Sequence, residues 1–265
     1  MDNENEGPVL LLQRDGIAEI RFNRPAAMNA LDVPTAEGFL DAVTRATQDP
    51  ATRVILITGA GDNFLAGGDL VSMHKAGDRA VDVVDALITP MHRALELLDK
   101  AAPPSLARLQ GAVAGAGVSI ALATDLAIAA DNVRFNLAYI NIGGVPDCSG
   151  SWQLPRVVGL RKALEIALLG ETMPVDEAAR LGMVNRVVPL AELTDATEAL
   201  AQRLAAGPPV AQAGTRRLLR DSLGRTLHDQ LAAEEESFKR CAVTADFQEG
   251  LAAFFDRRKP QFTGK

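Results

Sequence analysis

Glycine-rich turns and one later aspartate are the residues of this chain whose types and spacing could do chemistry. In the stretch Leu106–Gly150, a short apolar strand runs into a glycine-rich turn, Gly111–Gly117, and an apolar helix-like run, Val118–Ala123, follows at once. This order directs backbone N–H groups and the positive end of a helix at one point. Asp147 lies further along, in a Gly/Pro loop between apolar segments. An anion-stabilising turn and one acid in an apolar setting could move protons next to a carbonyl group.

The elements that must position these residues alternate between strands and helices up to about residue 189. The predicted strands are Val9–Gln13, Ile17–Phe22, Arg53–Thr58, Ser105–Leu109, Asp125–Ala129 and Val184–Val188. The predicted helices include one from Asp32 or Thr35 to about Thr47, then Val81–Leu98, Trp152–Gly170 with a break near Gly159, and Val175–Leu181. From Leu190 onward only helices are expected, with a break at Gly207-Pro208-Pro209. The pattern predicts an α/β core with a helical C-terminal extension.

Two segments of the predicted core, Ile55–Leu70 and Leu106–Leu122, have the same order of strand, glycine-rich turn and helix. If the fold brings the two turns together, two sets of backbone N–H groups point at one place. The glycines could instead mark a dinucleotide-binding fingerprint, but Gly115–Ile120 and Gly59–Phe64 both lack its final glycine. A structural role also remains open, because only glycine permits very close packing of a helix on a strand.

Composition limits the classes of partner. The net charge of -7 and the pI near 5.1 argue against nucleic acid or an anionic membrane as the main partner. The basic clusters Arg216-Arg217 and Arg257-Arg258-Lys259 could still meet a phosphate-bearing ligand. Cys148 and Cys241 form neither a disulfide framework nor a metal-ligand spacing, so we expect a cytoplasmic location. Residues 1–8 lack the features of a signal peptide and are expected to be disordered.

Several motifs occur in a fixed order along the chain. They are Asn23-Arg24-Pro25, Asn29-Ala30-Leu31, Phe64–Asp69, Gly111–Gly117 with Asp125, Gly143–Asp147, Leu154-Pro155-Arg156 with Gly159, Ala178–Asn185 and Phe254–Lys259. Together they resemble the enoyl-CoA hydratase/isomerase (crotonase) superfamily over roughly residues 9 to 263. The resemblance implies a spiral of ββα units with a helical C-terminal trimerisation region. It suggests a spiral core over residues 9–200 and a trimerisation and lid region over residues 201–265.

The resemblance also implies an acyl-CoA thioester substrate and a homotrimer or a dimer of trimers. Members of the superfamily stabilise an enolate oxygen with two backbone N–H groups, which by position fall on Gly68 and Ala116. The residues expected to bind the substrate or its CoA are Ala66, Asp69, Leu70, Ser119, Tyr139, Phe254 and Arg257. Phe254 and Arg257 match CoA-binding positions that often come from the neighbouring subunit. No metal and no separate cofactor is expected, since the substrate carries the coenzyme A.

The sequence departs from the hydratases of this superfamily at two positions. Hydratases use two glutamates to hold and add a water molecule, and these positions fall on Ser119 and Tyr139 here. Classical hydration is therefore not expected, and Asp147 is the remaining candidate for proton transfer. Its loop, Val145–Trp152, resembles the same loop in epoxyphenylacetyl-CoA isomerases of the bacterial phenylacetate pathway. The competing interpretation of Asp147 is a turn or helix-capping residue after Pro146.

These observations favour an acyl-CoA isomerase that shifts a double bond or opens an epoxide-fused ring, with Asp147 as its catalytic residue. The alternatives are an enoyl-CoA hydratase that uses a single acid, and a catalytically silent protein that binds CoA thioesters.

Three other side chains are weaker candidates for a functional role. Cys148 is expected to be a packed thiol rather than a nucleophile. His74 is either a surface residue or part of a CoA channel, and Arg108 is expected to snorkel or to form an ion pair.

Overall fold

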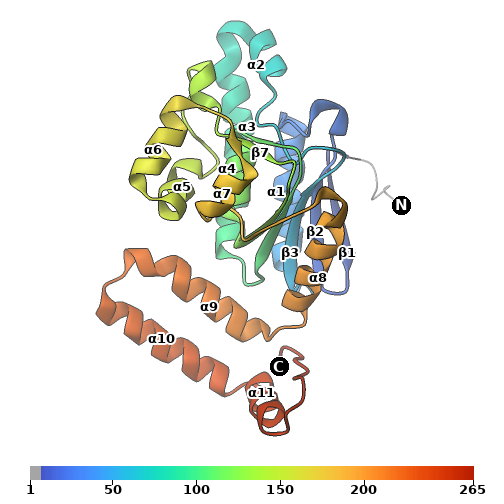
Figure 1. Ribbon diagram of the computed structural model, residues 1–265, viewed down its shortest axis with the longest axis vertical. Helices are drawn as coiled ribbons and strands as arrows, with labels where there is room; N and C mark the ends of the chain where they lie inside the picture. The colour runs from blue at the N-terminus through green and yellow to red at the C-terminus, as the bar shows by residue number, and fades with distance from the viewer. Residues whose placement is uncertain (1–6) are drawn as a thin grey trace.

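Six strands form the main sheet of the computed structural model, which describes residues 7–265 (Figure 1). Their order across the sheet is β1-β2-β3-β4-β6-β9. The bounds are β1 Val9–Arg14, β2 Ile17–Phe22, β3 Val54–Gly59, β4 Ser105–Leu109, β6 Leu126–Ala130 and β9 Arg186–Val188. β1 pairs antiparallel with β2, and the other neighbours are parallel. The predicted hairpin and the predicted buried strand are confirmed, since every residue of β3 is buried.

Helices cover the two faces of this sheet. Phe22 of β2 stacks on Phe39 of α1 (Val33–Gln48), so α1 lies on the face where Phe22 points. Successive strand residues point to opposite faces, so Arg21 points to the other face, which α8 (Leu193–Ala205) covers. α3 (Ala80–Lys100) packs beside α1. Of the predicted caps, Asp32 is the one that begins α1, accepting a hydrogen bond from the Thr35 N–H at 3.0 Å.

A second, smaller sheet was not predicted from the sequence. It contains β5 (Ala112–Ala114), β7 (Arg134–Asn136) and β8 (Met173–Pro174). Strands of two or three residues are too short to show a period of alternating burial, so the pattern gives no sign of them. The remaining helices of the core are α2 Leu70–Ala76, α4 Ala116–Ala123, α5 Gly150–Val158, α6 Leu160–Leu169 and α7 Val175–Arg180. The predicted break near Gly159 is confirmed by the boundary between α5 and α6.

The last helices form a separate layer below the core (Figure 1). They are α9 Pro209–Asp221, α10 Leu227–Ala242 and α11 Ala245–Phe255, and α9 packs against α10. The expected domain boundary at residue 200 falls inside α8, whose Thr197 and Ala201 are buried. We place the division at Ala206–Pro208, where the predicted break occurs. Within residues 7–265, no helix combines the length and the apolar character needed to cross a membrane.

Asp125 attaches α9 to the core. Its carboxylate accepts hydrogen bonds from Arg216 at 2.7 Å and from Arg220 at 2.8 Å, both on α9. Burial by itself would raise the pKa of Asp125, but the charges of these two arginines outweigh burial and hold the pKa below its ordinary value. Arg216 is buried and also donates to the carbonyl of Leu98. The suggestion that Arg216 meets a phosphate-bearing ligand is therefore wrong, because its guanidinium is used inside the fold.

The N-terminal prediction is only partly covered by the structure. Residues 1–6, which were expected to be disordered, lie outside the described residues. The next two residues of that expected segment are in contact with the core. Asn23 donates from its side chain to the carbonyl of Gly7 at 3.0 Å and from its backbone N–H to that of Pro8 at 2.8 Å.

Candidate functional site

The two glycine-rich turns meet, as the family resemblance implied. The N–H of Ala114 donates to the carbonyl of Leu65 at 2.9 Å. A Cβ added to Gly117 would lie only 2.2 Å from that same carbonyl oxygen, so only glycine fits at this position. A Cβ at Gly115 would lie 3.4 Å from the Cα of Gly67. The structural role and the anion-binding role of the glycines are therefore compatible, because the close packing that glycine permits brings the two turns together.

Two backbone N–H groups on these turns are free. Among the described residues, neither the N–H of Gly68 nor that of Ala116 donates a hydrogen bond. The neighbouring N–H groups of Ala66 and Asp69 are used, donating to the carbonyls of Met28 and Leu31. Ala116 is the first residue of α4, where the helix dipole favours negative charge. This pair of donors has the chemistry needed to bind an oxyanion.

Asp69 and Leu70 begin the helix that follows the first turn. The carboxylate of Asp69 accepts hydrogen bonds from the N–H groups of Val71 at 3.1 Å and Ser72 at 3.3 Å, so it caps α2. Its second oxygen lies 3.6 Å from Arg24. These contacts account for the Asp69 side chain as a structural group. Leu70 is half exposed and His74 is exposed, both on α2.

Asp147 pairs with Tyr139, a contact that sequence reasoning missed. The phenol O–H of Tyr139 donates a hydrogen bond to Oδ1 of Asp147. Burial raises the pKa of Tyr139 well above its usual range, and the nearby Asp147 carboxylate raises it further. The phenol therefore remains protonated at neutral pH and can only donate to the carboxylate. The other oxygen of Asp147 accepts no hydrogen bond from an N–H or O–H donor within residues 7–265, and the weak S–H donor of Cys148 lies beside the carboxylate. This oxygen is therefore open to a stronger partner.

Ser119 connects Asp147 to the glycine turns. It is fully buried on α4, one helical turn after Ala116, which is a rise of about 5 Å. A Cβ added to Gly150 would lie 2.4 Å from the Ser119 hydroxyl oxygen, so the loop that carries Asp147 packs directly on Ser119. That hydroxyl has no hydrogen-bond partner of normal geometry among the described residues. The helix α4 therefore carries the free N–H of Ala116 at its start and contacts the loop of Asp147 one turn later.

Two properties of the Asp147 loop bear on its chemistry. Cys148 is fully buried, and burial followed by the charge of Asp147 raises its pKa well above the ordinary value. The thiolate is therefore disfavoured, and the prediction of a packed thiol is confirmed. Asp147 also lines a cavity of about 470 Å³ together with His92, Trp152 and nine other residues. Gly68 and Ala116 do not line this cavity.

Phe254 and Arg257 lie away from these groups. In one chain, Figure 1 places α11 at the end of the molecule opposite α2. The side chain of Phe254 is 77% exposed, and Arg257 is exposed as well. α11 ends at Phe255, and Arg257 adopts a left-handed backbone with φ 55° that does not continue the helix. A single chain therefore does not bring Phe254 and Arg257 to Gly68, Ala116 or Asp147.

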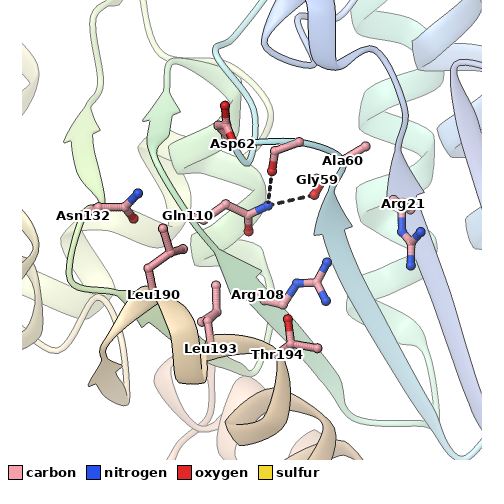
Figure 2. Close-up of a pocket in the computed structure, with 11 residues that line it drawn as sticks. Arg21, Gly59, Ala60, Asp62, Arg108, Gln110, Asn132, Leu190, Leu193 and Thr194 are labelled. Atoms are coloured by element: carbon pink, nitrogen blue, oxygen red, sulfur yellow. Dashed lines mark hydrogen bonds between the residues drawn. The ribbon is translucent and has the colours of Figure 1, made fainter.

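Of the two alternatives for Arg108, no ion pair is found within residues 7–265, and snorkelling remains, since the partly buried side chain lines a cavity. Arg108 is half-buried on β4, and this cavity lies on the α8 side of the sheet (Figure 2). The carboxylate beside it, Glu19, is already bound by Arg14, Arg21 and Thr58. Sequence reasoning gave no sign of this cluster, because its members come from different strands.

Comparisons with known proteins agree with this arrangement. A family model described as enoyl-CoA hydratase/isomerase matches residues 13–265. A Rhodobacter capsulatus protein named "Probable enoyl-CoA hydratase" is 36% identical over 95% of this chain and 96% of its own length. The 1,2-epoxyphenylacetyl-CoA isomerase of Escherichia coli is 34% identical over 94% of this chain and 96% of its own.

A solved structure has the same fold. The crystal structure of an enoyl-CoA hydratase from Polaromonas sp. JS666 superimposes with a TM-score of 0.91 at 31% identity, covering 96% of this chain and 99% of that one. Its match includes the α/β core and the helical C-terminal region. The relatives carry both hydratase and isomerase names. They therefore identify the family but not which of the two reactions this chain catalyses. The chain belongs to the enoyl-CoA hydratase/isomerase family.

Proposed function

We propose that this protein is an acyl-CoA isomerase that moves a proton within an unsaturated or aryl-epoxide acyl-CoA thioester. The observation that carries the proposal is the environment of Asp147, whose carboxylate has a neutral phenol as its hydrogen-bond partner and one oxygen that no N–H or O–H donor within residues 7–265 uses. The two positions where hydratases of the family hold glutamates are the buried Ser119 and the protonated Tyr139. One acid at the site favours moving a single proton over adding a water molecule.

The free N–H groups of Gly68 and Ala116 are proposed to bind the thioester carbonyl oxygen. They stabilise the negative charge that develops on this oxygen when the adjacent carbon loses a proton. A preorganised donor of this kind is worth about 3 kcal/mol of transition-state stabilisation. Because the donors are backbone groups held by two packed turns, they need no rearrangement as the charge develops.

For a 3-enoyl-CoA substrate, Asp147 takes a proton from C2 and the electron pair of the broken C–H bond forms a dienolate. Asp147 then returns the proton to C4, the double bond moves to C2–C3, and the carboxylate is restored. Tyr139 donates to Oδ1 throughout and leaves Oδ2 to exchange the proton. This cycle needs no cofactor besides the coenzyme A of the substrate.

The test is a spectroscopic assay of the wild type and Asp147→Asn on 3-enoyl-CoA, crotonyl-CoA and epoxyphenylacetyl-CoA. We expect isomerisation by the wild type and a loss of at least ~100-fold in the variant, the usual reach of general acid–base catalysis. Asp41→Asn, at an exposed position of α1, is the matched control and should react like the wild type. Brisk hydration of crotonyl-CoA that Asp147→Asn abolishes would favour the hydratase. Tight CoA binding without turnover would favour the silent homologue.

We also propose that the protein is a homotrimer or a dimer of trimers, in the cytoplasm. The C-terminal layer supports the oligomer, because it exposes large apolar side chains that an isolated surface rarely carries. They include Leu219, Leu223, Leu227, Leu231, Phe238, Phe254 and Phe255. A neighbouring subunit could then supply Phe254 and Arg257 to the CoA. A molar mass of one chain by light scattering would contradict this proposal.

A further inference from the structure

Arg108 is a half-buried cation without a protein partner in the part of the chain that the structure describes. An arginine stays charged in proteins, so its charge must be compensated by something other than deprotonation. Burial lowers the pKa of Arg108 below its usual value. The charge of Glu19 and, less strongly, that of Glu198 act against this lowering, and the charges of Arg21 and Arg14 add to it. Glu198 is already paired with Arg14. Since Glu19 already accepts from Arg14, Arg21 and Thr58, it does not neutralise Arg108 as well.

The guanidinium of Arg108 lines a cavity of about 490 Å³ at the carboxyl ends of β3 and β4 (Figure 2). This volume lies within the range of small-molecule sites, and ligands of open α/β sheets bind at this edge. The wall opposite the strands is the first turn of α8, with Leu193 and Thr194. Figure 2 shows the carboxylate of Asp62, also a lining residue, turned away from Arg108.

Gln110, which also lines the cavity, has a buried acceptor atom without a partner among the described residues. The residue is 6% exposed, and its Nε2 donates to the carbonyls of Gly59 at 2.8 Å and Gly61 at 3.1 Å. These two bonds fix which end of the amide is nitrogen. The remaining atom, Oε1, is buried and accepts no hydrogen bond from a described residue. A buried carbonyl oxygen of this kind needs a donor.

We propose that this cavity is a second ligand site, for a small anion that carries both an ionised oxygen and an O–H group. Hydrogen phosphate and hydroxycarboxylates share this chemistry. The fork of Arg108 binds two oxygens of the anion, and a small movement of the Gln110 amide opens its Oε1 to accept from the O–H. Asp147 lines a different cavity, so the site is separate from the proposed catalytic acid and does not depend on the isomerase reaction.

The test measures binding of inorganic phosphate and of glycolate by calorimetry, with sodium chloride holding the ionic strength constant. The wild type should bind one of the two anions saturably, and the anion that binds identifies the class. Arg108→Met, which keeps an unbranched apolar stem and removes the guanidinium, should weaken binding at least ~10-fold, as expected for a charged hydrogen bond. Arg45→Met, at an exposed site on α1, should bind like the wild type.

Arg108→Lys serves as a second variant, because it keeps the charge inside the fold and loses only the fork. It should bind more weakly than the wild type and more tightly than Arg108→Met. Absence of saturable binding of both anions by the wild type would overturn the proposal. So would equal affinities of the wild type and Arg108→Lys, or of the wild type and a folded Arg108→Met.

Discussion

Asp125 and Asp147 lie close to the same buried helix, α4, but differ in what surrounds their charge. Asp125 follows the end of α4 and accepts hydrogen bonds from two arginines of α9 and from Ser105. Asp147 packs beside the middle of α4, and the Tyr139 phenol is the donor that its side chain has among the described residues. The first carboxylate is fully used by the fold, and the second keeps one oxygen open to a stronger partner.

This difference teaches how one fold can use aspartate in two ways. Two guanidinium groups lower the pKa of Asp125, so this carboxylate remains ionised and holds α9 on the core. A proton acceptor in catalysis must instead gain and lose a proton at little cost, which two fixed cations would prevent. A neutral phenol orients Asp147 without fixing its charge. Asp125 is therefore expected to determine stability, and Asp147 to determine the rate.

Among the substitutions that test this difference between Asp125 and Asp147, replacement of Asp125 should have the largest effect. Asp125→Ala leaves the buried Arg216 without its carboxylate, and loss of one partner of a buried ion pair costs about 3 kcal/mol or more of unfolding free energy. Urea unfolding measures the loss. Asp41→Ala removes an exposed pair with Arg45 and should cost less than about 1 kcal/mol. Equal losses in the two variants would show that Asp125 does not hold α9.

Replacement of Tyr139 sharpens the comparison and should have a smaller effect. Tyr139→Phe keeps the buried ring and removes the hydrogen bond to Asp147. Because hydrogen bonds to charged groups are worth about 1.5–3 kcal/mol, we expect kcat to fall at least ~10-fold. KM should change much less, because the phenol touches the carboxylate and not the bulk of the substrate. An unchanged kcat would indicate that Tyr139 only fills space.

The fold could be predicted because its signals are local. The apolar run before Gly59, the cap at Asp32 and the break before Pro208 each depend on neighbouring residues, and the structure has all three. The glycine-rich turns were also a useful signal, because only glycine fits at Gly117, where an added Cβ would lie 2.2 Å from the Leu65 carbonyl oxygen. Short strands of the second sheet gave no such signal.

The partners of the charged and polar side chains could not be predicted, because they depend on tertiary contacts. Arg216 and Asp125 are 91 residues apart in sequence, and the basic pair Arg216-Arg217 looked like a surface cluster. Tyr139 and Asp147 are 8 residues apart, but a left-handed turn and a Gly/Pro loop separate them, so no helical or strand spacing relates them. Arg108 stood out as unusual on an apolar strand, yet only the structure shows that Glu19 is not free to pair with it.

The most direct test of the account measures kcat for 3-enoyl-CoA isomerisation and the unfolding free energy on the same preparations of wild type, Asp147→Asn and Asp125→Asn. We predict that Asp147→Asn loses at least ~100-fold in kcat and keeps the stability of the wild type. Asp125→Asn should lose stability and keep most of the rate per folded molecule. If Asp147→Asn turns over like the wild type, Asp147 is a turn residue and the proposed mechanism is wrong.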